Sequence, residues 1–73
     1  MRLPLISGPE LIKALAKIGY AATRQRGSHI RLQCIGKSSI TVPNYRLIER
    51  TLLKKILRDA HLSPEDFLDL LKK

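Results

Sequence analysis

The feature that most constrains the fold is a stretch in which the hydrophobic pattern changes to a period of two. Residues 29–34 read HIRLQC, and polar and apolar side chains alternate strictly along them. This alternation predicts a half-buried β-strand, because successive side chains of a strand point to opposite faces. The open face is expected to carry His29, Arg31 and Gln33, and the covered face Ile30, Leu32 and Cys34.

Helical patterns flank this strand on both sides. Residues 7–10 read SGPE, a capping-box pattern that starts a helix, and Gly19 is its expected stop. Its apolar side is Leu11, Ala14, Leu15 and Ile18, with Lys13 and Lys17 toward water. Thr51 is expected to cap a second helix with an apolar stripe, Leu52, Leu53, Ile56, Leu57 and Ala60, opposite Lys54, Lys55 and Arg58. Residues 63–66, SPED, predict a short last helix containing Phe67, Leu70 and Leu71.

Two more strands complete the expected sheet. Residues 20–25 form a weaker strand joined to the central one by a Gly27-Ser28 turn, and a turn around Gly36 leads to Ile40 and Val42 before Pro43 ends the ladder. Residues 44–50 favour neither helix nor strand. We therefore predict one α+β domain over residues 1–73, ordered α-β-β-β-α with a short C-terminal helix. Its three-stranded antiparallel sheet packs on the helices, as in the double-stranded-RNA-binding domain.

Charge indicates the class of partner. Fourteen Lys and Arg against six Asp and Glu leave a net charge of +8, which favours nucleic acid. No apolar run is long enough to span a membrane and residues 1–7 are too short for a signal peptide, so we expect a cytoplasmic protein without membrane contact. Cys34 is the only cysteine. It has no disulfide partner and no zinc-ligand spacing, so we expect a core residue and no metal or cofactor.

The stretch RQRGSH, residues 24–29, holds the first histidine of the chain. His29 follows the expected turn and lies on the expected open face with Arg31, while Arg24 and Arg26 lie across or beside the turn. From pattern alone, His29 is a catalytic group, an RNA contact or a solvated polar residue. Ser28 is equally compatible with a phosphate contact and with a turn role. We assign His61 to a helix end and Lys54, Lys55 and Arg58 to a solvated helix face.

The succession SGPELIKALAKIGY, RQRGSHI, VPN, TLLKKILRDAHLSPEDF resembles the HicA toxins, small ribonucleases of bacterial toxin-antitoxin pairs. The resemblance covers nearly the whole chain and rests on the order and spacing of its pieces. It implies a fold similar to the double-stranded-RNA-binding domain, metal-independent cleavage of mRNA, and inhibition by a HicB-type antitoxin that covers the histidine of the Gly-Ser-His segment. Here that histidine is His29. Direct DNA binding is not expected except through the antitoxin.

Three positions depart from the family pattern. Tyr45 stands where the family often has histidine, Arg50 stands where it often has glycine, and His61 stands at another common glycine. The two glycine departures put local loop geometry in question. If the missing histidine assists catalysis, activity is reduced.

The chemistry needs proton carriers and phosphate binders. RNA supplies its own nucleophile, the 2′-hydroxyl, and histidine, with an ordinary pKa of about 6.5, can accept that proton near neutral pH. Arginine binds phosphate through a planar, permanently charged fork. The second proton carrier is solvent, Tyr45 or His29 itself. The alternative function is a non-catalytic double-stranded-RNA-binding module; a DNA-binding regulator lacks a recognition-helix pair.

Overall fold

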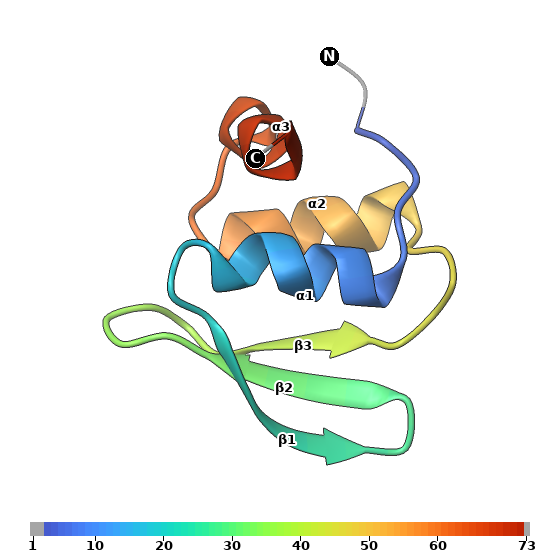
Figure 1. Ribbon diagram of the computed structural model, residues 1–73, viewed down its shortest axis with the longest axis vertical. Helices are drawn as coiled ribbons and strands as arrows, with labels where there is room; N and C mark the ends of the chain where they lie inside the picture. The colour runs from blue at the N-terminus through green and yellow to red at the C-terminus, as the bar shows by residue number, and fades with distance from the viewer. Residues whose placement is uncertain (1–2, 73) are drawn as a thin grey trace.

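The computed structural model describes residues 3–72, which form three layers (Figure 1). A three-stranded antiparallel sheet in the order β1-β2-β3 forms the first layer, and helices α1 and α2 cover one of its faces. Helix α3 lies on the far side of these two helices, away from the sheet. The elements are α1 (Gly8–Ala16), β1 (Ala21–Arg26), β2 (His29–Gln33), β3 (Ile40–Pro43), α2 (Arg50–Asp59) and α3 (Pro64–Lys72). The predicted α+β fold, like that of the double-stranded-RNA-binding domain, is confirmed.

The core lies between the sheet and helices α1 and α2, and it continues between these helices and α3, which contributes Phe67. The predicted alternation of β2 holds: Leu32 is fully buried, Ile30 and Cys34 are half-buried, and His29 and Arg31 are exposed. Burial of a large apolar side chain stabilises the fold by about 1.5–3 kcal/mol, so these contacts decide which face of the sheet meets the helices. The largest fully buried side chains are Phe67, Leu11, Leu15, Leu32, Ile48, Leu53, Leu57 and Val42.

The capping box at the start of α1 is confirmed. The Glu10 backbone N–H donates to Ser7 Oγ at 3.2 Å, and the Ser7 backbone N–H donates to Glu10 Oε1 at 3.0 Å. These hydrogen bonds, first the one from the Ser7 backbone and then the one from its hydroxyl, lower the pKa of Glu10. The predicted cap of α3 is also present, since the Asp66 N–H donates to Ser63 Oγ at 3.1 Å.

Gly8, besides opening α1, lies in close contact with the end of β3. A Cβ at this position would overlap the carbonyl oxygen of Pro43, so the first turn of α1 can touch the end of β3 only because residue 8 is glycine. The Gly8 N–H donates to the Tyr45 carbonyl at 2.8 Å. This contact joins α1 to the segment that follows the sheet.

Helices α1 and α2 end in the same way. After α1, Gly19 has a φ of 106° and the Tyr20 N–H donates to the Leu15 carbonyl at 3.2 Å. After α2, His61 has a φ of 56° and the Leu62 N–H donates to the Leu57 carbonyl at 2.9 Å. Both are left-handed Schellman ends, a conformation that favours glycine. The predicted stop at Gly19 is confirmed.

Two expected boundaries differ from the structure. Strand β1 begins at Ala21 rather than Tyr20, because the Tyr20 N–H is used by the end of α1. The predicted cap at Thr51 is wrong: α2 begins at Arg50, with Glu49 as a cap residue that makes no side-chain hydrogen bond. The start is fixed instead by tertiary contact, since Arg50 Nε donates to the Leu3 carbonyl at 2.7 Å.

The sequence favoured no structure for residues 44–50; residues 44–49 connect β3 to α2 through a bend and an isolated β-bridge, and Arg50 opens α2. Ile48 pairs with Ile6, and the Ile48 N–H donates to the Ile6 carbonyl at 2.7 Å. Both side chains are buried. The N-terminal segment therefore holds this connection in place.

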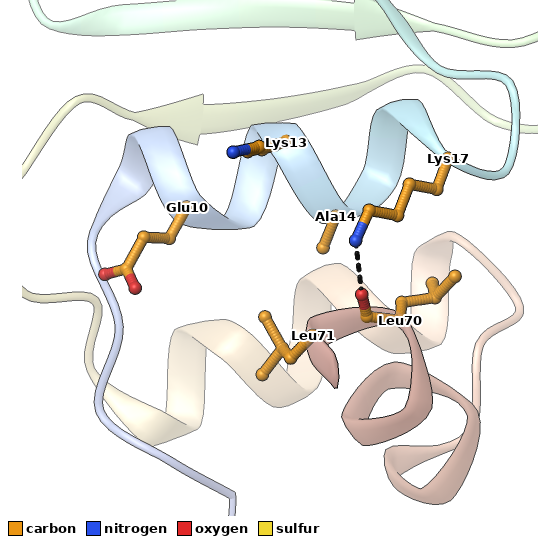
Figure 2. A pocket seen from close by; sticks show the side chains of 6 residues that line it. All are labelled: Glu10, Lys13, Ala14, Lys17, Leu70 and Leu71. Carbon is orange, nitrogen blue, oxygen red and sulfur yellow. Dashed lines mark hydrogen bonds between the residues drawn. The ribbon is translucent and has the colours of Figure 1, made fainter. Parts of the chain in front are cut away.

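Helix α3 is attached to α1 by packing and by a hydrogen bond from Lys17. Lys17 Nζ donates to the Leu70 carbonyl at 2.6 Å across a hollow of about 210 Å³ (Figure 2). Glu10, Lys13, Ala14 and Leu71 also line this hollow, and α1 separates it from the strands.

No helix within residues 3–72 is long and apolar enough to cross a membrane.

Candidate functional site

The β1-β2 hairpin places His29 directly beside its turn. Gly27 adopts a φ of 59°, as tight hairpin turns require, and Arg26 pairs with His29 across the turn. On the other side of β2, His29 pairs with Pro43 at the end of β3. His29 is therefore held by hydrogen-bonded strands on both sides while its side chain stays exposed.

The two-residue turn decides where the arginines lie. Because Arg26 pairs with His29 directly across the turn, Arg24 pairs with Arg31. Side chains of directly opposed residues share a face, and Arg31 is on the open one. Arg24 and Arg26 therefore lie on the same face as His29. The register shifts only beyond Arg24, where Thr23 is an extra residue before Ala22 pairs with Leu32.

These side chains form one shallow hollow on the open face of the sheet. Its volume is about 160 Å³, and its lining is Arg24, Arg26, His29, Arg31 and Thr41. Four of these are predicted site residues that the structure brings together. Thr41 was not predicted, although the same period-two rule could have placed it here, because it lies between the buried residues Ile40 and Val42.

Ser28, the remaining predicted site residue, does not line this hollow. It is exposed in the turn, and its carbonyl accepts the Asn44 N–H at 2.6 Å. The backbone of Ser28 therefore ties the hairpin turn to the segment after β3. Its hydroxyl makes no hydrogen bond with the residues that the structure describes.

The open face carries positive charge without acidic residues. No Asp or Glu occurs between Leu11 and Ile48, and no ion pair within the described part of the chain involves Arg24, Arg26 or Arg31. Arg24 and Arg31 stand directly opposite each other, an arrangement that like charges disfavour. An anion placed between their guanidinium groups would relieve this repulsion. The face is therefore suited to bind phosphate beside an imidazole.

Tyr45 adjoins this face at His29. The centroids of the two rings are 6.4 Å apart and the ring planes meet at 70°, an edge-to-face contact. Tyr45 is 48% exposed. An accessible aromatic ring therefore lies next to the predicted catalytic histidine, at the position where the resemblance led us to expect a second histidine.

Other polar groups lie away from this face. His61 is at the end of α2, and Lys54, Lys55 and Arg58 line a separate shallow hollow on the exposed side of that helix. The Tyr20 hydroxyl donates to the Ser38 carbonyl at 2.9 Å, and its pKa is raised by burial and then by the charges of Cys34 and Asp59. Within residues 3–72, no three His, Cys, Asp or Glu side chains are grouped to hold a metal ion.

Comparison with known families identifies the chain. A family model described as the HicA toxin of bacterial toxin-antitoxin pairs matches residues 8–62, which is more than half of the chain. The protein belongs to the HicA toxin family. The match begins at Gly8 and ends just after the Schellman end of α2, so it contains the whole sheet and the open face. This HicA protein is accordingly the toxin of a toxin-antitoxin pair, and its family implies an antitoxin partner.

Comparison with curated proteins and with solved structures gives no match for this HicA chain. Its family membership therefore rests on the family model, and the resemblance in order and spacing agrees with it. The two positions where the resemblance led us to expect glycine differ in backbone conformation. Arg50 takes an ordinary helical conformation, whereas His61 takes the left-handed one.

Proposed function

We propose that this HicA toxin is a metal-independent endoribonuclease that cleaves mRNA, with His29 as its catalytic residue. We further propose that residues 1–73 form one toxin domain and that a HicB-type antitoxin inhibits it by covering His29. The observation that carries the proposal is the composition of the open face. An exposed imidazole lies in one hollow with Arg24, Arg26 and Arg31, and no Asp or Glu lines that hollow.

In the proposed reaction, the 2′-hydroxyl of a nucleotide attacks the adjacent phosphorus. His29 accepts the proton of that hydroxyl, the new bond from the 2′-oxygen to phosphorus forms, and the bond to the 5′-oxygen of the next nucleotide breaks. The 5′-oxygen takes a proton from the imidazolium or from water, and the products are a 2′,3′-cyclic phosphate and a 5′-hydroxyl. The guanidinium groups of Arg24 and Arg31 stabilise the charge that develops on the phosphate oxygens. Ser28, in the turn, is a further proposed contact to the RNA backbone.

The test compares purified protein with His29→Ala on single-stranded RNA in the presence of EDTA. Positioned acid-base catalysis contributes about 10²–10⁴ in rate, so we expect His29→Ala to lose at least about 100-fold in cleavage. His29 is exposed, so the variant should keep its unfolding midpoint. Growth should arrest when the parent is expressed without antitoxin and should continue with His29→Ala.

The matched control is the second histidine. His61→Gly changes the other imidazole of the chain, at a position outside the open face, and should cleave at the parental rate. Equal RNA binding by the parent and His29→Ala, with cleavage by neither, would instead establish the alternative, a non-catalytic RNA-binding module. Cleavage that EDTA abolishes would contradict the metal-independent mechanism.

A further inference from the structure

We propose that Tyr45 is a stacking platform for one unpaired nucleobase of the RNA, next to the phosphate held at His29, and that the substrate is therefore single-stranded at the cleavage site. This inference rests on the proposed function in one respect: it assumes that RNA occupies the open face. It assigns Tyr45 a role in binding and not in proton transfer.

Tyr45 differs from the other aromatic residues of the chain in its exposure. Phe67 is fully buried and Tyr20 is 3% exposed with its hydroxyl bonded to Ser38, so both belong to the core. Tyr45 is 48% exposed, and it lies beside the basic hollow. In a chain with only three such aromatic residues, the accessible one adjoins His29.

Backbone hydrogen bonds to α1 and to the hairpin turn hold the segment that contains Tyr45. Its carbonyl accepts the Gly8 N–H at 2.8 Å, and the preceding N–H, that of Asn44, donates to the Ser28 carbonyl at 2.6 Å. Because Ser28 precedes His29, the segment that carries the tyrosine is bonded to the turn that carries the histidine. These two hydrogen bonds restrain the backbone at Tyr45, which reduces the entropy lost when a base stacks on its ring.

The distance between Tyr45 and His29 suits one RNA strand that places a base at the tyrosine and a phosphate at the histidine. The tyrosine and imidazole centroids are 6.4 Å apart, so a base stacked on Tyr45 and a phosphate at His29 can belong to adjoining groups of one strand. A base within a duplex is covered by its stacked neighbours and cannot offer its face to a side chain. Stacking on tyrosine accepts any base, so this contact selects unpaired RNA rather than a particular sequence.

The test measures binding to a short single-stranded 2′-fluoro RNA, which lacks the nucleophile and cannot be cleaved by the proposed route. Loss of stacking should weaken binding roughly tenfold in Tyr45→Ala. Tyr45→Phe keeps the ring and should bind like the parent. The same strand made without bases should bind the parent and Tyr45→Ala equally.

Tyr45→Trp supplies a second measurement. The chain has no tryptophan, so the new side chain would be its only indole, and stacking of a base should quench its fluorescence. The strand without bases should not quench it. The parent should prefer the single strand over the matching duplex, and Tyr45→Ala should lose most of that preference.

Several results would overturn the assignment. These are unchanged affinity in Tyr45→Ala, an equal loss in Tyr45→Phe, an equal loss with the strand that has no bases, or weakened antitoxin binding with RNA binding intact. The cleavage assay with His29→Ala tests the proposed function separately. Binding that depends on the ring, without any cleavage, would keep the platform and reject the ribonuclease.

Discussion

His61 adopts a left-handed backbone conformation in which a side chain costs free energy. Its φ of 56° completes the Schellman end of α2, and it is the only residue other than glycine with a positive φ among residues 3–72. A Cβ in this conformation costs about 1–2 kcal/mol, partly offset by the greater freedom of glycine in the unfolded chain.

We therefore expect His61→Gly to raise the free energy of unfolding by about 0.5–1 kcal/mol, measured by urea denaturation. His61→Ala keeps the Cβ and removes the imidazole, so it serves as the control and should give no such gain. Equal stability of the two variants would show that the backbone conformation is not strained.

Individual residues also show where sequence reasoning succeeds and where it stops. The hydrogen bonds of Ser7 with Glu10 and the alternation around Leu32 are local, so residue type and spacing predicted them. The tight contact of Gly8 with Pro43 depends on two segments that meet only in the folded chain. No sequence pattern within either segment predicts this contact.

Repulsion between two of its own arginines destabilises the β1-β2 hairpin. Arg24 and Arg31 are directly paired in the register that the turn sets, and the register shifts beyond them, at Thr23. This shift was not foreseen, because one extra residue in an exposed strand leaves no mark on the hydrophobic pattern; all of β1 is exposed. The three arginines were predicted as site residues; the face of Arg31 was predicted too, but that of Arg24 and Arg26 was not.

Replacing one member of this pair should stabilise the free protein. We expect Arg24→Thr to raise the free energy of unfolding by about 0.5 kcal/mol at low ionic strength, because it removes like-charge repulsion and adds a residue that favours strands. The gain should shrink in about 1 M NaCl, where the Debye length is about 3 Å. The same variant should bind RNA more weakly. A loss of stability at low salt would contradict this account of the pair.

The helix starts also show that local patterns predict caps but not contacts between distant segments. The patterns SGPE and SPED each predicted a cap that is present, because both depend on residues three positions apart. Thr51 also has a capping side chain, yet α2 begins before it, where Arg50 reaches Leu3 and Ile48 pairs with Ile6. Contacts with the N-terminal segment outweigh a local preference here.

The molecule as a whole separates its charges. The strands carry arginines and no carboxylate, whereas α3 holds Glu65, Asp66 and Asp69 and lies at the other end of the longest axis, which spans 32 Å (Figure 1). At physiological salt the Debye length is about 8 Å, so the acidic helix has little influence on an anion at the sheet. The position of each charge should therefore affect the affinity for RNA more than the net charge does.

Two single substitutions test this separation. Arg31→Gln should weaken RNA binding and reduce the slope of log affinity against log salt by about 0.7, the value for one lost phosphate contact on a single strand. Asp69→Asn changes the net charge by the same amount in the opposite direction, but at α3, and should leave affinity and slope unchanged. A clear increase in affinity for Asp69→Asn would mean that net charge governs binding.

The contact of Gly8 with Pro43 and Tyr45 makes the open face depend on a distant part of the chain. His29 and the arginines are placed by pairing within the sheet, whereas Tyr45 is held where the start of α1 meets the far end of the sheet. Such a contact closes a long loop, which costs entropy. The basic hollow and the tyrosine beside it are therefore complete only in a chain whose sheet is docked on α1.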